Sequence, residues 1–244
     1  MPKLEAAEVT VRFGGNTALD AASVAAEAGQ VTGLIGPNGA GKTTLFNVVT
    51  GLLPPTSGSI SIDGRDVTRL GPHKRARTGL ARTFQRLELF TMLTVRENIR
   101  VAADIHKRWS HDKEDPAELT DRILDRVGLA HCADVRVTSL PTGQGRLVEL
   151  GRALACKPSI LLLDEPASGQ DENETEQFAR LLRELASEGM AVVLVEHDVQ
   201  LVMAVCDRIS VLDFGKVIAS GTPAEIQHDE AVLAAYLGAA PEPA

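Results

Sequence analysis

Residues 36–43, GPNGAGKT, combine glycines with a lysine and a threonine at a spacing typical of phosphate binding. An apolar stretch, VTGLI, precedes them and a helix-like stretch, TTLFNVVTGLL, follows. Glycines let backbone N–H groups converge on phosphate oxygens, and the start of a helix adds positive potential. Lys42 would then meet the β and γ phosphates, while Thr43 would offer its hydroxyl to Mg²⁺. We therefore expect nucleotide contacts from Asn38, Gly39, Ala40, Gly41, Lys42, Thr43 and Thr44.

Two acids end a second apolar run, ILLLDE, at residues 160–165. Asp164, at the end of a buried strand, is suited to hold the metal beside Lys42 and Thr43. Glu165 is suited to orient and polarise an attacking water. Alone, the run could be an ordinary strand end, but together with the phosphate loop it predicts nucleotide hydrolysis.

His197 follows another apolar run, VVLVEHD, so it should emerge at the carboxyl end of a strand. Ligands of parallel α/β sheets gather along that edge. We therefore expect His197 to contact the γ-phosphate, although a single histidine is more often a surface or core residue. The catalytic candidates are Lys42, Glu165 and His197.

The elements that must position these residues follow from hydrophobic periodicity. Val9, Val11 and Phe13 alternate with polar residues, as do the isoleucines of SGSISIDG, which predicts half-buried antiparallel strands. The runs VTGLIG, SILLLD, AVVLVEH and RISVLD are continuously apolar, as parallel strands covered on both faces are. LDFGKVIASG is expected to be a hairpin. The fold class is therefore α/β, with a parallel core sheet and an N-terminal antiparallel β subdomain.

Between residues 70 and 140 the strand pattern disappears and helix signals replace it. Thr94 and Glu97 have the spacing of a capping box. Asp115 precedes a proline that would occupy the first helical position, and Gly128 suits the end of that helix. We expect a helical block in this part of the chain.

The domain organisation is expected to be one domain over residues 1–237, with a helical subdomain at about 70–155 inserted into the core. The polar connector at 109–116, WSHDKEDP, is expected to be mobile. Residues 238–244, GAAPEPA, are expected to be disordered.

Composition limits the partners. The chain has 244 residues, 44% apolar and 24% charged, with a formal net charge of −8. That balance argues against a general nucleic-acid surface, although a local basic patch remains compatible with it. One basic run, HKRARTGLARTFQR, is most simply a solvated helix face. It contains Lys74, Arg75, Arg77, Arg82 and Arg86.

Three cysteines, Cys132, Cys156 and Cys206, are far apart and fit no metal-ligand spacing. An odd number without a secretory signal is typical of reduced thiols in a cytosolic protein. No apolar stretch approaches the roughly 20 residues that span a bilayer. Any role at a membrane is therefore expected to depend on a partner.

The motifs, in their order along the chain, resemble those of the ATP-binding subunit of an ABC transporter, and the resemblance extends over about residues 4–237. The phosphate loop and ILLLDE resemble its Walker A and Walker B motifs. Gln85 resembles the Q-loop glutamine, which implies metal contact and coupling to a transmembrane partner. Asp171, in SGQD, resembles the D-loop aspartate, and His197 matches the switch histidine. The resemblance implies a P-loop NTPase fold with ATP and Mg²⁺ as cofactors.

The segment LPTGQGR lies where that family carries its signature, commonly LSGGQ. In the family, the signature of one subunit completes the ATP site of the other, which implies a head-to-tail dimer. Pro141 replaces a serine that would present a hydroxyl and an N–H, and Thr142 replaces a glycine. Proline is tolerated at a helix start, so Thr142, Gly143 and Gln144 could still face phosphate in trans. We expect a working but weakened or re-registered signature.

The helix after the signature is expected to carry Arg146, Glu149 and Arg152 on one side, where they can pair three residues apart. Leucines on its other side, Leu147, Leu150 and Leu154, would face the core.

Two apolar features have open alternatives. Phe13 lies where the family places an aromatic residue against adenine, but it could also be a core strand residue. The segment 86–94, RLELFTMLT, either packs inside the helical subdomain or forms a groove for a helix of the membrane subunit. Its apolar residues are Leu87, Leu89, Phe90, Met92 and Leu93.

Longer stretches of the sequence look most like the branched-chain amino acid importer cassettes, although related lipid and organic-anion cassettes share much of the same sequence. The resemblance implies transmembrane permease subunits as partners, a periplasmic or extracellular solute-binding protein indirectly, and a peripheral place on the cytoplasmic face of the membrane. Cargo, direction of transport, and homodimer or heterodimer stay open. Two other functions are compatible with the chain. They are a weakly active regulatory nucleotide-binding module, suggested by Pro141 and Gln170, and a soluble ABC ATPase of translation or DNA repair.

Overall fold

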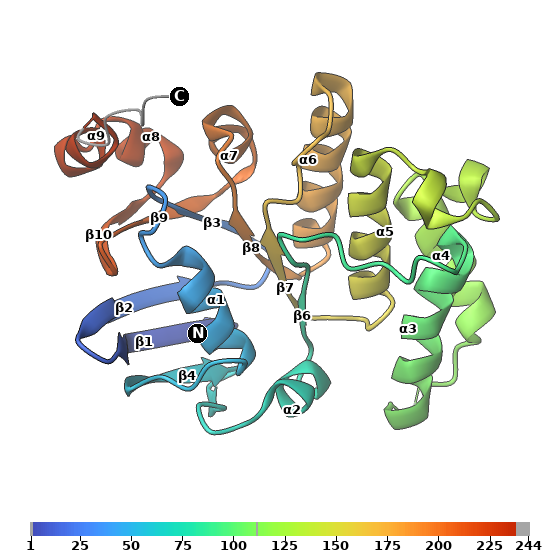
Figure 1. The fold of residues 1–244 in the computed structure, drawn as a ribbon, viewed down its shortest axis with the longest axis horizontal. Coiled ribbons are helices and arrows are strands. Elements are labelled where there is room, and N and C mark those ends of the chain that lie inside the picture. Colours follow the sequence, from blue (N-terminus) through green and yellow to red (C-terminus); the bar gives the residue numbers. More distant parts are fainter. Residues whose placement is uncertain (1, 111, 238–244) are drawn as a thin grey trace.

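A computed structural model describes residues 2–110 and 112–237, which form two β-sheets and a group of helices at one end (Figure 1). The smaller sheet is antiparallel, in the order β2-β1-β4-β5. Its strands are β1 (Leu4–Phe13), β2 (Asn16–Ala26), β4 (Ser57–Ile62) and β5 (Arg65–Asp66). This is the antiparallel N-terminal sheet that the alternating pattern predicts.

The larger sheet carries the site. Its order is β10-β9-β3-β8-β7-β6, parallel except for the β9–β10 hairpin at one edge. The strands are β3 (Val31–Ile35), β6 (Leu80–Arg82), β7 (Ile160–Asp164), β8 (Ala191–Val195), β9 (Arg208–Asp213) and β10 (Lys216–Gly221). Every residue of β3, β7 and β8 is buried, as the continuously apolar runs predict. The predicted parallel core is confirmed.

Strand β6 was not expected, because the sequence between 70 and 140 shows no strand pattern. It has three residues and pairs with β7 in parallel, Leu80 opposite Ile160 and Arg82 opposite Leu162. A strand this short has no measurable periodicity, so only its pairing with β7 defines it.

Each buried strand contributes side chains to two hydrophobic cores, because successive side chains point to opposite faces of the sheet. Leu161 and Leu163 of β7 belong to the core shared with the helices α3 and α6. Ile160 and Leu162 belong to the core shared with α1 and the antiparallel sheet. Helix α1 (Lys42–Thr50) follows the phosphate loop. The part of the chain after β7 contributes the helices α6 (Glu172–Ser187), α7 (Val199–Val205), α8 (Pro223–Gln227) and α9 (Glu230–Leu237).

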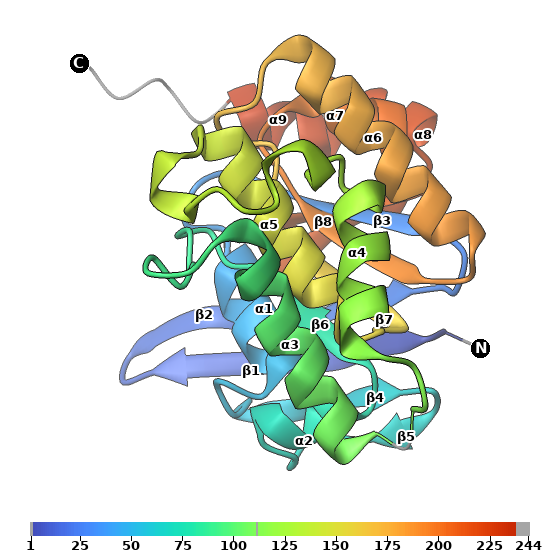
Figure 2. The same cartoon turned by 90° about the vertical axis from the view of Figure 1, so that its right-hand side faces the viewer.

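The helical block consists of α3 (Val95–Trp109), α4 (Pro116–Arg126) and α5 (Thr142–Leu154), whereas α2 (Pro72–Arg77) packs beside α1 and β6 (Figure 1). Figure 2 looks onto this end of the molecule, where α3 and α4 lie side by side and α5 runs between them and the sheet. The Thr94–Glu97 capping box is present. Asp115 caps α4, and Gly128 follows that helix with φ of 74°. These three predictions are confirmed.

Acidic residues of the α3–α4 connector form ion pairs, and the mobility expected of residues 109–116 stays a prediction. Lys157 pairs with Asp112 and Glu114, and Arg122 also pairs with Glu114. The tail prediction, 238–244, lies outside the described residues. None of the helices in 2–110 and 112–237 is long and apolar enough to cross a membrane.

Two arginines of the basic run are buried, which corrects the expectation of a solvated helix face for this run. Arg75 is 1% exposed, and its guanidinium donates to the carbonyl oxygens of Val48, Val49, Thr68 and Leu70. The side chain of Arg82 is 5% exposed. Lys74, Arg77 and Arg86 are exposed, as expected. A guanidinium that packs against the end of a helix can be buried, because its five N–H groups can donate to several carbonyl oxygens at once.

Candidate active site

The phosphate-binding candidate is a loop that curls around the amine of Lys42. Lys42 Nζ donates hydrogen bonds to the carbonyl oxygens of Gly36 (2.7 Å) and Pro37 (2.9 Å). A Cβ at Gly36 would lie 1.9 Å from the Leu212 carbonyl oxygen, so only glycine fits there. Burial lowers the pKa of Lys42, against the raising effect of the charges of Glu165 and Asp164. The lysine is thus partly dehydrated and lies within the field of both acids.

The start of α1 offers unfilled donors beside this lysine. The helix begins at Lys42 after Gly41, whose φ is 110°, and no side chain caps it. The first N–H groups of a helix have no partner within it, so they suit an anion. Asn38, Gly39 and Thr43 are exposed here, whereas Ala40 is buried. This arrangement fits the phosphates of a nucleotide.

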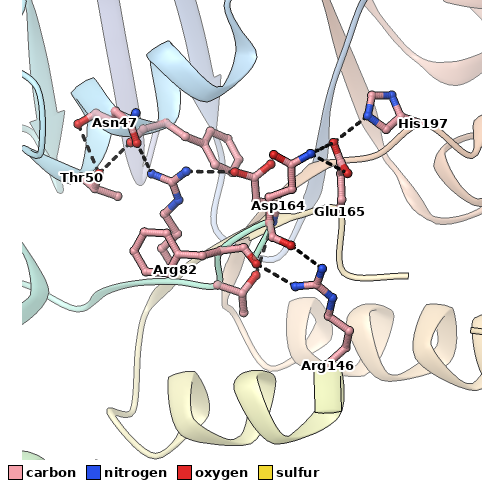
Figure 3. Close-up of polar contacts among 11 residues, drawn as sticks. Asn47, Thr50, Arg82, Arg146, Asp164, Glu165 and His197 are labelled. Carbon is pink, nitrogen blue, oxygen red and sulfur yellow. Dashed lines mark hydrogen bonds and ion pairs between the residues drawn. The ribbon is translucent and has the colours of Figure 1, made fainter. Parts of the chain in front are cut away.

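Asp164 ends β7 and is held by an arginine (Figure 3). The carboxylate is 2% exposed, and Arg82 Nη2 lies 2.9 Å from its Oδ2. Arg82 Nη1 lies 2.7 Å from Asn47 Oδ1, on α1. Sequence reasoning missed Arg82 because its position depends on β6.

Glu165 joins two residues that are far away in the sequence. His197 Nε2 lies 2.6 Å from Glu165 Oε1, and Gln85 Nε2 lies 3.0 Å from both carboxylate oxygens. Figure 3 shows His197 and Glu165 pointing toward each other beyond the end of β7. The Glu165 N–H donates to the Val195 carbonyl (2.9 Å), so the glutamate sits where β7 and β8 end. The structure therefore brings together three of the predicted site residues.

A second buried acid supports this arrangement and was missed from the sequence. Glu196 is 7% exposed and accepts hydrogen bonds from the backbone N–H groups of Ala167 and His197. Burial raises its pKa. The signal was an acid directly before His197 at a strand end. Glu196 ties the backbone of His197 to the segment that follows Glu165.

The oxygen donors near the loop fit magnesium. No group of three or more His, Cys, Asp or Glu residues in 2–110 and 112–237 forms a metal site. The expected donors are the Thr43 hydroxyl, which is exposed, the Gln85 amide oxygen, and the Asp164 carboxylate, which Arg82 already contacts. Magnesium commonly keeps waters and phosphate oxygens and takes only one or two carboxylates from the protein. This donor set is therefore sufficient for an ion that arrives with phosphate.

The signature segment begins α5 without disruption. Pro141 is the N-cap residue, and its carbonyl accepts from the Gly145 N–H (3.1 Å). Thr142 is exposed and lies against Gly169. Gly143 is buried, and a Cβ there would lie 2.9 Å from Glu174 Oε2. The candidate signature residues Thr142, Gly143 and Gln144 thus begin α5 close to the segment that contains Asp171.

Asp171 has a local structural task. It caps α6, accepting from the Glu174 N–H (2.8 Å) in a complete capping box with Glu174. Its side chain is therefore fixed at the helix start, beside the signature segment.

Residues 84–88 pack against the polar side of α5. Arg146 and Glu149 pair as predicted (3.0 Å), but both are buried. Arg146 donates to the carbonyl oxygens of Phe84 (2.8 Å) and Gln85, and Glu149 accepts from the Glu88 N–H (2.8 Å). Burial raises the pKa of Glu149. The backbone around Gln85 is thus fastened to the helix that follows the signature.

Phe13 is 53% exposed at the tip of the β1–β2 hairpin, so it is not a core strand residue. The segment 86–94 is mixed. Leu87, Phe90 and Met92 are exposed, while Leu89 packs against the core. A groove of about 550 Å³ runs between this segment, β6 and α3. Its lining includes Leu52, Phe84, Phe90, Ile105, Trp109 and Arg152.

Comparison with known proteins gives consistent results along the chain. The ABC transporter family model matches residues 19–168, and the model of the branched-chain amino acid ATP-binding cassette transporter matches 216–242. The chain is 39% identical over 252 residues to the high-affinity branched-chain amino acid transport ATP-binding protein BraF of Pseudomonas aeruginosa, covering 98% of this chain and 99% of BraF. It is 35% identical to the lipopolysaccharide export system ATP-binding protein LptB of Escherichia coli K12, covering 98% of both.

Solved structures show the same fold. The ADP conformation of the ATP-binding cassette MJ1267 superposes with a TM-score of 0.84 at 30% identity, covering 98% of this chain and 99% of that one. A dimeric post-hydrolysis state of the cassette MJ0796, bound to ADP and Pi, gives 0.80 at 27% identity, covering 90% and 98%. With the ABC transporter model matching more than half of its length and a full-length relative at 39% identity, the chain belongs to the family of ABC transporter ATP-binding subunits.

Proposed function

We propose that this ABC transporter ATP-binding subunit hydrolyses ATP with Mg²⁺ and powers import of branched-chain amino acids or a related small solute. The observation that carries the hydrolytic part is the meeting of His197 and Gln85 on the Glu165 carboxylate. A weakly active nucleotide-binding module would not need these three groups to converge beyond the phosphate loop.

Lys42 and the start of α1 hold the phosphates in this proposal. The buried amine supplies positive charge to the β and γ oxygens, and the loop N–H groups fix their position. Thr43, Asp164 and Gln85 would hold magnesium, which would supply positive charge to offset the charge that develops on the phosphates. Phe13, exposed at its hairpin tip, is available to stack on adenine.

Glu165 acts as the water-orienting base. Its carboxylate accepts the proton of the attacking water, and its backbone position is fixed by the bond to the Val195 carbonyl. His197 holds Glu165 in place through Nε2 and stabilises the γ-phosphate region. Most of the rate enhancement comes from positioning and charge stabilisation.

Two cassettes pair head to tail, so that Thr142, Gly143 and Gln144 of one face the γ-phosphate held by the other. The dimeric cassette MJ0796 supports the pairing. Pro141 provides no N–H at the signature, and Gly143 is already buried against Glu174 in its own chain. Asp171, beside the signature segment, belongs to the same dimer surface. The signature therefore works with fewer donors than its usual sequence provides.

The membrane partners are permease subunits at the cytoplasmic face, supplied with solute by a binding protein. The groove beside residues 86–94, lined by apolar and aromatic side chains, suits a partner helix. The likeness to BraF supports branched-chain amino acids as cargo. The likeness to LptB makes lipopolysaccharide-type export the second candidate.

The function is tested by comparing the purified chain with its Glu165→Gln variant. We expect the wild type to hydrolyse ATP, and the variant to lose hydrolysis and accumulate an ATP-bound dimer in size-exclusion chromatography. Hydrolysis by the variant at the wild-type rate would refute the role of Glu165. A wild type without turnover would indicate the regulatory module. Mass spectrometry of membrane subunits that co-purify with the chain decides between importer and exporter partners.

A further inference from the structure

Two buried arginines lie near α1, and they are bonded very differently. Arg75 donates to four backbone carbonyls through all three nitrogens, so it is a structural arginine that ends α1. Among the residues in 2–110 and 112–237, the Arg82 guanidinium bonds two side chains, Asn47 and Asp164, and no backbone carbonyl. Its Nε is buried and has no hydrogen-bond partner among the residues that the structure describes. A structural account therefore explains Arg75 but not Arg82.

The position of Arg82 is set by its surroundings on several sides. Its guanidinium carbon lies 5.3 Å from the centre of the Phe46 ring and 4.9 Å from that of Phe84. Nη1 lies 2.7 Å from Asn47 Oδ1, and Nη2 lies 2.9 Å from Asp164 Oδ2. Figure 3 shows the guanidinium spanning the space between α1 and the end of β7. The group is thus held with one edge on the carboxylate.

The ion pair between Arg82 and Asp164 is almost completely shielded from solvent. The Arg82 and Asp164 side chains are 5% and 2% exposed. A guanidinium stays charged in proteins, so it cannot leave the acid by losing a proton. In such a site a second cation on the same carboxylate meets a full positive charge at short range, weakly screened. The acid that would contribute to the magnesium site is therefore already neutralised.

We propose that Arg82 is a positioning residue, a resident counter-cation that keeps divalent metal off Asp164 until the phosphates of a nucleotide supply further negative charge. This rests on the proposed nucleotide site. It goes further in assigning to Arg82 the exclusion of divalent metal from Asp164 before nucleotide binds.

Arg82 also lies three residues before Gln85, the other proposed metal contact. Its strand, β6, is paired with β7, and Phe84 stacks on its guanidinium. Asp164 and the Gln85 segment are therefore linked through one side chain. A displacement of residues 84–88 would therefore also alter the contacts of the Asp164 carboxylate.

The test measures metal binding without nucleotide. Mn²⁺ is titrated into the purified full chain and followed by electron paramagnetic resonance of free Mn²⁺. We expect Arg82→Met to bind Mn²⁺ at least tenfold more tightly than the wild type. We also expect Mg²⁺ to raise the unfolding temperature of this variant more than that of the wild type. Arg82→Lys, which retains the charge, should stay close to the wild type.

Two further variants keep the outcome decisive. Arg82→Gln keeps a donor near Asp164 without the charge and replaces Arg82→Met if the latter does not fold. In the double variant with Asp164→Asn the gained Mn²⁺ binding should vanish. Unchanged Mn²⁺ affinity in both neutral variants, or a gain that survives Asp164→Asn, would overturn the proposal. Because none of these measurements uses ATP, a failure here is separate from a failure of the hydrolysis proposal.

Discussion

His197 Nε2 lies 2.6 Å from Glu165 Oε1, although 32 positions separate the two residues. The contact exists because β7 and β8 are adjacent parallel strands, so their carboxyl ends reach the same edge of the sheet. Glu165 directly follows β7 and His197 is the second residue after β8, and every residue of both strands is buried. A single geometric rule thus explains how an acid and an imidazole from distant segments share one proposed site.

Substitution of His197 by alanine should lower kcat by about 100-fold or more, because the carboxylate loses the group that orients it. KM for ATP should change little, since the phosphate loop is untouched. Steady-state ATPase kinetics measure both constants. His228→Ala is the matched control, because that ring is exposed and bonds only the Ala224 carbonyl in the described contacts. Equal rates for the two variants would contradict the role of His197.

Arg75 should be among the residues on which stability depends most. Arg75→Ala removes a donor from four carbonyl oxygens, two in buried and two in partly buried contacts, at a cost of about 2–4 kcal/mol in the free energy of unfolding. Urea denaturation followed by circular dichroism measures this change. Arg77→Ala, on the exposed side of the same helix, should stay within about 0.5 kcal/mol. A similar effect of both substitutions would show that the carbonyl contacts of Arg75 carry no special weight.

The sequence predicted the parts of the fold that have strong local signals. The phosphate loop, the buried parallel strands and the Thr94 capping box each repeat a pattern that physical constraints make recognisable. The meeting of Asp164, Glu165 and His197 at one edge followed from the rule for parallel strands. The order of strands and polar residues along the chain is therefore sufficient to predict that these three residues lie together.

The missed features depend on tertiary pairing. Arg82 reaches Asp164 only because β6 joins the edge of the sheet, and three residues carry no periodicity. Arg146 and Glu149 have the spacing of a solvent-exposed helical pair. They are buried because residues 84–88 cover them, and backbone groups of this segment form hydrogen bonds with both side chains. Polar residues that bond distant backbone groups cannot be told from surface residues by spacing alone.

Pro141→Ser should tighten ATP-driven pairing of two cassettes. Serine restores an N–H and a hydroxyl at the signature, and one charge-assisted contact is worth about 1.5–3 kcal/mol, or roughly 10-fold to 100-fold in the dimer dissociation constant. Analytical ultracentrifugation with ATP, in the Glu165→Gln background, measures the constant. Pro54→Ser, an exposed proline outside this segment, is the control. Unchanged or weaker pairing would show that Pro141 does not limit the signature.

Cys206 should make stability depend on alkaline pH. Burial, helped by the charge of Asp207, raises the pKa of its thiol to about 12 from an ordinary value of 9.0. The folded state therefore keeps a proton that the unfolded state releases, so stability falls as pH rises from about 9 toward 12. The free energy of unfolding, measured by urea titration between pH 8 and pH 10.5, should decline less steeply in Cys206→Ala. Parallel declines in the two proteins would exclude Cys206 as the source.

Ile105→Glu should weaken association with the membrane partner. Ile105 is 54% exposed on α3 and lines the groove beside Phe90 and Trp109, the surface that we propose receives a partner helix. A carboxylate placed in an apolar interface loses its hydration without gaining a partner, so recovery of permease subunits with a tagged cassette should fall roughly tenfold or more. Leu233→Glu introduces the same charge at a similarly exposed leucine of α9, away from the groove. Thermal unfolding of both variants verifies that each is folded. Full recovery of the permease with Ile105→Glu would mean that the partner helix binds elsewhere on the cassette.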